Sequence, residues 1–230
     1  MGNRRCLAFA TLAAGTLLGV PPLFGASSAL AAACATASVS VYEAAGFSCN
    51  VGAVTFSDIS VSTTASGSGV VTLSDFSPFT VVVDGVTNFG LHLSYASNTS
   101  ATPGSQADVS LSYNVSGAPS LTNAFAEFAG TTTGTGRADL SEVLSNGVSL
   151  TLTSPGATSA VFSAIRTLGV IKDQSDFAGS AGSADSSILG NAFSVTAVPE
   201  ASTWAMMVIG FAGLGIAGCR ASQKRAVAAA

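Results

Sequence analysis

Between residues 34 and 197, short runs of β-branched and aromatic residues are separated by Gly, Asn, Asp, Ser or Pro. This spacing is typical of the strands and turns of an all-β domain. Alternation is strictest in "ADVSLSYNV" (107–115), where apolar residues take turns with Asp, Ser and Asn. Because successive side chains of a strand point to opposite faces, we expect one buried and one solvated face there.

Other segments extend this prediction. "AVTFSDISV" (53–61) changes phase in its middle, which indicates a β-bulge. "FTVVVDGVTNFGLHLSYA" (79–96) predicts a hairpin that turns at Asp84-Gly85. Further strands are expected at 121–129, 136–144, 148–154, 159–173 and 186–195, whereas the small residues of 177–187 predict a long surface loop. Nine or ten strands in one domain predict a single β-sandwich with a jelly-roll-like topology.

The composition narrows the class of protein. The chain has 230 residues, of which 48% are hydrophobic and only 9% charged. No apolar run of about 20 residues occurs between 34 and 197, so a multi-span membrane protein is excluded. Residues 34–198 carry three basic and eleven acidic side chains, a net charge of −8. Nucleic-acid binding needs a basic surface and is excluded as well.

Residues 1–33 have the composition of a secretory signal peptide. Two arginines precede an apolar stretch, and two Ala-x-Ala cleavage sites end at Ala31 and Ala33. We therefore expect export through the Sec translocon and cleavage by signal peptidase, with a mature domain at 34–197. One alternative is a retained N-terminal membrane anchor, although Pro21-Pro22 ends the apolar stretch early. Another is a lipoprotein acylated at Cys34, although Ala31 stands where a large aliphatic residue is expected.

Only two of the four cysteines, Cys34 and Cys49, lie in the expected exported domain. In an oxidising compartment such a pair predicts one disulfide, and closing a loop of this length contributes about 3 kcal/mol. A zinc site is not expected, because His92 is the single histidine and no C-x-x-C is present.

The C-terminal segment 198–225, "VPEASTWAMMVIGFAGLGIAGCRASQKR", has three parts. A short motif (198–205) precedes sixteen uncharged residues (204–219), which as a helix of about 24 Å could just cross a membrane. A basic tail (220–225) follows and should stay cytoplasmic, which leaves the domain outside. The segment thus predicts a transmembrane helix that anchors the chain.

This arrangement resembles the PEP-CTERM sorting signal of Gram-negative bacteria in its PEPxxWA variant. The matching residues are Val198, Pro199, Glu200, Trp204 and Ala205 in the motif, and Arg220, Lys224 and Arg225 in the basic end. Ala201 stands where the motif has its second Pro. The resemblance implies processing by exosortase and release or attachment at the cell surface, often in species that make exopolysaccharide. A plain C-terminal anchor is the alternative.

The candidates for chemistry are few. His92 lies in an alternating strand on the face opposite Leu91 and Leu93, which indicates a surface or strand-edge histidine. Asp139 and Glu142 are three residues apart, so on a strand they would point to opposite faces and could not act as a glycosidase pair. "KDQSD" (172–176) with Asp185 offers oxygen ligands for calcium, but a solvated acidic loop is the expected reading.

We therefore predict no catalytic residue, metal ligand or cofactor site. The expected function is that of an exported, non-catalytic surface or matrix protein associated with exopolysaccharide. One alternative is a carbohydrate- or calcium-binding module permanently anchored by its C-terminal helix. Another is a weak hydrolase that depends on Glu127 or His92.

Overall fold

The computed structural model describes residues 31–100 and 102–196, together with the single residues 207, 209 and 211. The sorting motif, the transmembrane helix, the basic tail and almost all of the signal peptide lie outside these residues, so their predictions stay predictions. Within the described ranges, the search for a helix of sufficient length and apolar character to cross a membrane finds none.

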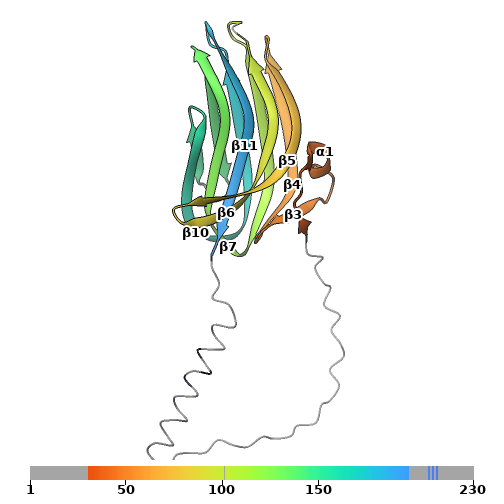
Figure 1. The fold of residues 1–230 in the computed structure, drawn as a ribbon, viewed down its shortest axis with the longest axis vertical. Coiled ribbons are helices and arrows are strands. Elements are labelled where there is room, and N and C mark those ends of the chain that lie inside the picture. The colour runs from red at the N-terminus through yellow and green to blue at the C-terminus, as the bar shows by residue number, and fades with distance from the viewer. Residues whose placement is uncertain (1–30, 101, 197–206, 208, 210, 212–230) are drawn as a thin grey trace, which may run out of the picture. The chain divides into compact units, whose positions relative to one another are not determined.

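The described domain is built from eleven strands and one short helix (Figure 1). Their bounds are β1 Ala32–Ala33, β2 Ala37–Ser38, α1 Val39–Tyr42, β3 Ser48–Val51, β4 Val54–Ser66, β5 Val70–Val83, β6 Val86–Thr99, β7 Gln106–Gly134, β8 Arg137–Leu144, β9 Ser149–Leu152, β10 Gly156–Phe177 and β11 Gly182–Val195. The prediction of an all-β domain is confirmed.

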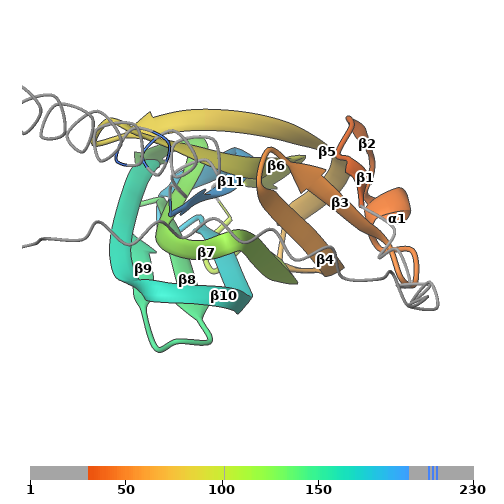
Figure 2. The same cartoon turned by 90° about the horizontal axis from the view of Figure 1, so that it is seen from below.

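All eleven strands belong to one sheet, and the long strand β7 joins its two halves. Its first part pairs with β4 and with the end of β10, whereas its second part pairs with β11 and with the start of β10. The first half of the sheet continues through β8 and β9, and the second through β6 and β5. The sheet curls so that these halves face each other, as the view from below shows (Figure 2).

The space between the two halves holds the core. In the first half, the alternating segment predicted at 107–115 buries Val109, Leu111, Tyr113 and Val115. The second half contributes other fully buried apolar side chains, among them Leu93, Leu121, Leu189 and Phe193. The alternation read from the sequence therefore identifies the inner face correctly.

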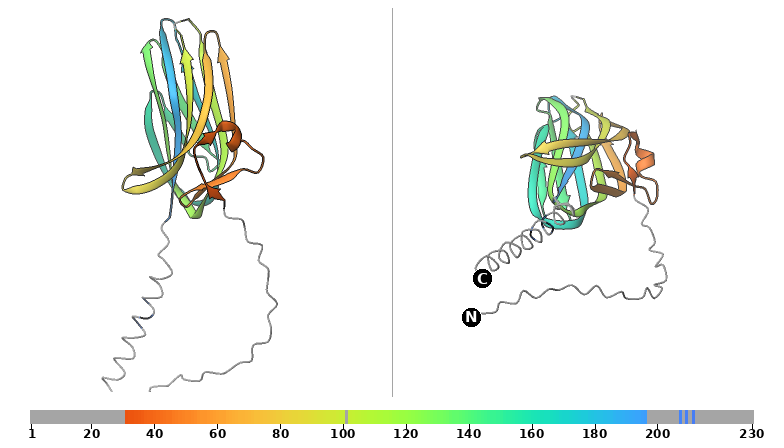
Figure 3. Two further views of the ribbon diagram at one scale, coloured as in Figure 1. Left: turned by 45° about the vertical axis from the view of Figure 1, so that its right-hand side comes forward. Right: turned by 60° about the horizontal axis from the view of Figure 1, so that its bottom comes forward.

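Several expected elements are confirmed in detail. A register shift between Ser57 and Ser60 of β4 is the predicted bulge. Strands β5 and β6 form the predicted hairpin, whose tip projects from the sheet (Figure 3). Its turn residues Asp84 and Gly85 both have positive φ, 50° and 79°, as a tight two-residue hairpin turn requires. Segment 159–173 is part of β10 and not a helix.

The predicted loop at 177–187 is wrong. β10 continues to Phe177 and β11 begins at Gly182, so the connection is only four residues long. Small residues such as Gly and Ser suggested a loop, but here they suit the close packing of paired strands. A Cβ at Gly182 would overlap the carbonyl oxygen of Thr133 on the neighbouring strand.

The predicted disulfide between Cys34 and Cys49 is present, with the two Cα atoms 4.8 Å apart. It lies beside the parallel pairing of β1 with β3. Helix α1 follows closely and buries Tyr42, whose hydroxyl donates to the carbonyl oxygen of Ala35 at 2.7 Å. The disulfide and this packing hold the N-terminal segment at one edge of the sheet.

Candidate functional site

The solvent side of the first half of the sheet is largely polar. It is formed by the outward side chains of β4, the first part of β7, the end of β10, β8 and β9, and we call it the outer polar face. Alternation places Asp108, Ser110, Ser112 and Asn114 of β7 on this face, opposite the buried apolar residues of the same strand. On β10, Asp173 and Ser175 lie next to them in register.

Two grooves at one end of the outer polar face adjoin each other and share Asp173 and Ser175. The first has a volume of about 200 Å³ and is lined by Ser62, Thr64, Gln106, Asp108, Ser110, Asp173 and Ser175. The second, of about 260 Å³, reaches across β10 to β8 and β9, and is lined by residues that include Arg137, Asp139, Ser141, Thr151, Thr153 and Phe177. Together they form a hollow rich in hydroxyl and carboxylate groups.

Two carboxylates set the charge of the first groove. Asp108 accepts hydrogen bonds from Thr64 Oγ1 at 3.0 Å and from Gln106 Nε2, which fixes its orientation. Partial burial and the nearby charge of Asp108 raise the pKa of Asp173 above its ordinary value. The groove therefore presents acceptor groups that are held in place and only partly satisfied by the protein.

A cation and an aromatic ring bound the second groove. Arg137 Nε lies 2.6 Å from Asp139 Oδ2, and the guanidinium carbon lies 4.8 Å from the centre of the Phe177 ring. The stacked guanidinium and ring give this end of the hollow a flat wall.

A third groove of about 340 Å³ lies further along the same face. It is lined by Asp58, Asn114, Val143 and Ile171, among others. Asp58 stands in the bulge of β4 with a positive φ of 53°, and its Oδ2 accepts a hydrogen bond from Asn114 Nδ2 at 2.9 Å. Ile171 is 61% exposed, so apolar surface accompanies the polar groups here.

The first two grooves lie far from the ends of the described domain. The backbone N–H of Thr196 donates to Ser120 O in the middle of β7, whereas Asp108 stands near the start of that strand. The separation along the strand is on the order of 30 Å. The hollow therefore lies far along β7 from the end at which the chain leaves the domain.

His92 and Glu127, the residues considered for a hydrolase, are brought together by the fold. His92 Nε2 lies 2.6 Å from Glu127 Oε1, and both side chains are partly exposed. They meet across Gly190 of β11, where a side chain would collide with both. The His92 ring also stacks on Phe79 with the ring centres 3.7 Å apart.

The predicted face of His92 is confirmed, since Leu91 and Leu93 are buried on the other side. Of the two expected positions, the surface position is confirmed, because the His92 side chain is partly exposed. The strand-edge position is wrong, because β6 lies between β5 and β11. Among the hydrogen bonds of the described residues, none joins a serine hydroxyl to His92.

The carboxylates considered for catalysis or calcium do not converge. Glu142 is buried and Asp139 lies on the outer polar face, so the prediction that they point to opposite faces is confirmed. Asp176 lies in the interior, whereas Asp173 and Asp185 lie on the solvent sides of two different strands. In the part of the chain that the structure describes, no three His, Cys, Asp or Glu side chains form a group that could hold a metal ion.

The expected solvated loop at 172–176 is wrong, because this segment is an interior strand with one polar face buried. Lys172, Gln174 and Asp176 of β10 alternate with outward residues and are 0% exposed. Sequence reasoning missed them because Lys, Gln and Asp are usually found outside. The sequence does hold one signal for their burial. Lys172, Gln174 and Asp176 continue the every-second-residue pattern of Leu168 and Val170, which point to the core.

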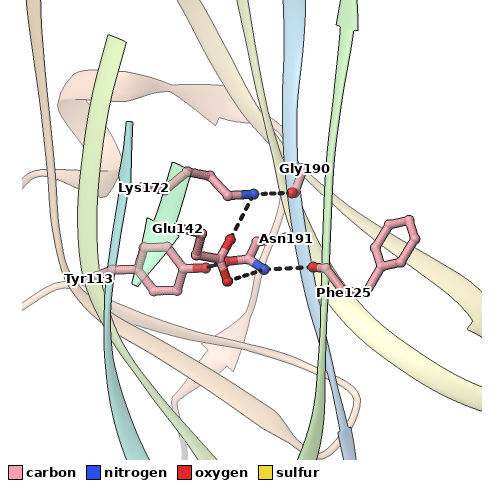
Figure 4. A network of polar contacts seen from close by, with 6 residues as sticks. All are labelled: Tyr113, Phe125, Glu142, Lys172, Gly190 and Asn191. Atoms are coloured by element: carbon pink, nitrogen blue, oxygen red, sulfur yellow. Dashed lines mark hydrogen bonds and ion pairs between the residues drawn. The ribbon is translucent and has the colours of Figure 1, made fainter. Parts of the chain in front are cut away.

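Lys172 and Glu142 form the centre of a buried polar cluster (Figure 4). Lys172 Nζ lies 3.1 Å from Glu142 Oε2 and also donates to the carbonyl oxygen of Gly190. Asn191 Nδ2 donates to Glu142 Oε1 at 3.2 Å and to the carbonyl oxygen of Phe125 at 2.6 Å. Tyr113 Oη donates to Asn191 Oδ1.

A second buried cluster surrounds Asp176. Its Oδ2 accepts from Ser97 Oγ at 2.5 Å, and its Oδ1 accepts from Gln174 Nε2 at 2.7 Å and from Ser186 Oγ at 2.8 Å. Burial raises the pKa of Asp176 above its ordinary value, although these three hydrogen bonds oppose the effect. This cluster connects β10 with β6 and β11 through the core.

Comparison with known proteins gives little guidance. No family model and no curated protein matches the chain. Among solved structures, the carbohydrate-binding module TmCBM61 in complex with β-1,4-galactotriose has 10% identity and a TM-score of 0.27, and the match covers 57% of this chain and 86% of that one. A family two carbohydrate esterase from Cellvibrio japonicus has 16% identity and a TM-score of 0.19, with 62% and 37% covered. At such TM-scores neither likeness bears on function.

Proposed function

We propose that the domain is the exported, surface-exposed part of a non-catalytic protein that binds extracellular polysaccharide through its outer polar face. The observation that carries this proposal is the pair of adjoining grooves centred on Asp173 and Ser175. Sugar hydroxyl groups donate and accept hydrogen bonds, so they match a hollow lined by serine, threonine and carboxylate groups.

The charge of the hollow indicates the class of polysaccharide. Three aspartates, Asp108, Asp139 and Asp173, face a single cation, Arg137. Chains rich in uronate or sulfate would be repelled by this excess of negative charge. The ligand is therefore a neutral polysaccharide whose hydroxyl groups donate to the aspartates.

The terminal segments determine where in the cell this function would be carried out. As proposed parts of the precursor, the signal peptide directs export through the Sec translocon, and the motif at 198–205 presents the chain to exosortase at the outer side of the membrane. The position of the grooves far from Thr196 suits a domain held at its C-terminal end. Within the all-β class, we assign the curled sheet to the β-sandwiches with a jelly-roll-like topology.

The binding proposal is tested with the domain of residues 31–196 on a panel of neutral and acidic polysaccharides. We expect affinity for at least one neutral polysaccharide. The double variant Asp108→Ala/Asp173→Ala should lose at least about tenfold in affinity, because it removes two charged acceptors. Isothermal titration or affinity electrophoresis provides the measurement.

The matched control is Asp185→Ala, which removes a carboxylate on the solvent side of β11, outside the residues that line the grooves. It should bind as the wild type does. Failure to bind any neutral polysaccharide, or equal losses in the groove variant and the control, would contradict the proposal.

A further inference from the structure

A lysine, an asparagine and a glutamate meet in the core, each on a different strand. Lys172 comes from β10, Glu142 from β8 and Asn191 from β11. The backbones of Lys172 and Glu142 are direct partners in the sheet, whereas Asn191 approaches from the opposing half. Lys172 Nζ donates to the carbonyl oxygen of Gly190, the residue before Asn191, so the amine lies against the backbone of β11 next to Asn191 (Figure 4).

The Glu142 carboxylate bridges these two groups. One oxygen lies 3.1 Å from Lys172 Nζ, and the other accepts a hydrogen bond from Asn191 Nδ2 at 3.2 Å. The Asn191 carbonyl oxygen in turn accepts a hydrogen bond from the Tyr113 hydroxyl. Each polar atom of the carboxamide thus has a partner that could take part in its conversion.

The surroundings exclude water. Lys172 and Glu142 are 0% exposed, Asn191 is 2% exposed and Tyr113 is 6% exposed. A buried ion pair of this kind contributes little to stability compared with apolar residues of the same volume, so its presence needs another reason.

We propose that Lys172 and Asn191 react with each other to form an intramolecular isopeptide bond, with Glu142 as the catalytic proton carrier. This activity is independent of polysaccharide binding. It would join β10 to β11 covalently through the core, and would thereby tie the two halves of the sheet together outside the cell.

The reaction needs no external reagent. The neutral amine of Lys172 attacks Asn191 Cγ, and a bond forms between Nζ and Cγ. The Tyr113 hydroxyl stabilises the negative charge that develops on Oδ1. Glu142 takes a proton from Nζ and delivers it to Nδ2, the bond between Cγ and Nδ2 breaks, and one ammonia molecule leaves. The amine and the carboxamide become a secondary amide and ammonia, so atoms and charges balance.

Burial favours the reactive protonation states. Desolvation lowers the pKa of the Lys172 ammonium, although the charge of Glu142 acts against this, and so promotes the neutral amine that attacks. Burial also raises the pKa of Tyr113 well above its ordinary value, which keeps its hydroxyl protonated as a donor.

The test is mass spectrometry of the full chain, purified in folded form and digested with a protease that cuts before aspartate. Cleavage before Asp173, Asp176 and Asp185 separates Lys172 from Asn191. We expect these two peptides to stay joined and to be lighter than their sum by one ammonia molecule. Trypsin should also fail to cut after Lys172, because its side chain is then an amide.

Two variants bracket the result. Glu142→Gln keeps the size of the side chain but cannot carry the proton, so the joined peptides should be lost. Ser186→Ala changes the neighbouring Asp176 cluster and leaves the reacting groups untouched, so it should still form the bond. Separate peptides from the folded wild type, or undiminished joining in Glu142→Gln, would overturn the proposal.

Discussion

The buried carboxyl group of Asp176 makes the free energy of unfolding depend on pH. It is 0% exposed and accepts three hydrogen bonds from neutral groups, with no cation among its hydrogen-bond partners in the described domain. The pKa of Asp176 is higher in the folded state than in the unfolded chain, where it is about 4. Its contribution to the free energy of unfolding is therefore fully present at a pH below about 4. That contribution is lost as the pH rises through the higher folded pKa.

Asp176→Asn removes this dependence and keeps the size of the side chain. We expect the variant to lose less stability than the wild type between pH 4 and pH 7, by a difference on the order of 1 kcal/mol. Thermal melts across this range measure it, and the raised pKa of Asp173 is common to both proteins. Parallel curves for the two proteins would show that Asp176 does not titrate as described.

The residues of the interior clusters also mark where prediction from the sequence failed. The sequence predicts a solvated loop for Lys172 and Asp176, because charged side chains are usually exposed. Their hydrogen-bond partners, such as Asn191 and Ser97, lie far away in the sequence, so no local pattern predicts these contacts. His92 and Glu127 could be named as candidates from the sequence, but their contact depends on the pairing of three strands.

At the scale of the strands, glycines allow close approach across the sheet. A Cβ at Gly90 of β6 would overlap the carbonyl oxygen of Asn191 and lie 2.6 Å from the Ala192 Cβ. Gly169 of β10 has no such restriction, since the nearest atoms to its Cβ position are 3.6 Å away.

We therefore expect Gly90→Ala to destabilise the domain by about 2 kcal/mol, because backbone atoms of β11 would have to move. Gly169→Ala should change the free energy of unfolding by less than about 0.5 kcal/mol. Urea denaturation of both variants gives the comparison. Equal effects would mean that the packing of β6 against β11 is looser than described.

The sequence largely predicts where strands occur, but it does not predict where each strand begins and ends. Alternation identified 107–115 and the hairpin at 79–96 because each pattern is local. The union of 107–115 with 121–129 into β7 was missed, since Gly117, Ala118 and Pro119 between them suggest a break. β7 nevertheless continues through these residues, and it pairs with β4 before them and with β11 after them.

At the scale of the whole molecule, the order of the strands depends on pairings between distant segments, such as β4 with β7 and β6 with β11. These pairings create both the outer polar face and the buried clusters, so neither could be derived from the sequence. The terminal segments show the opposite case. Their proposed function follows from short local motifs that can be recognised without knowing how the strands pair.

Export to the cell surface is the central claim, because the polysaccharide role requires it and the disulfide favours it. Its most direct test is the intact mass of the protein recovered from producing cells, with and without their exosortase. We predict a product that begins between Ala32 and Cys34 and ends near Pro199, and that is lost without the enzyme. A product that retains residues 199–230 in both strains would contradict the account and would indicate a permanently anchored protein.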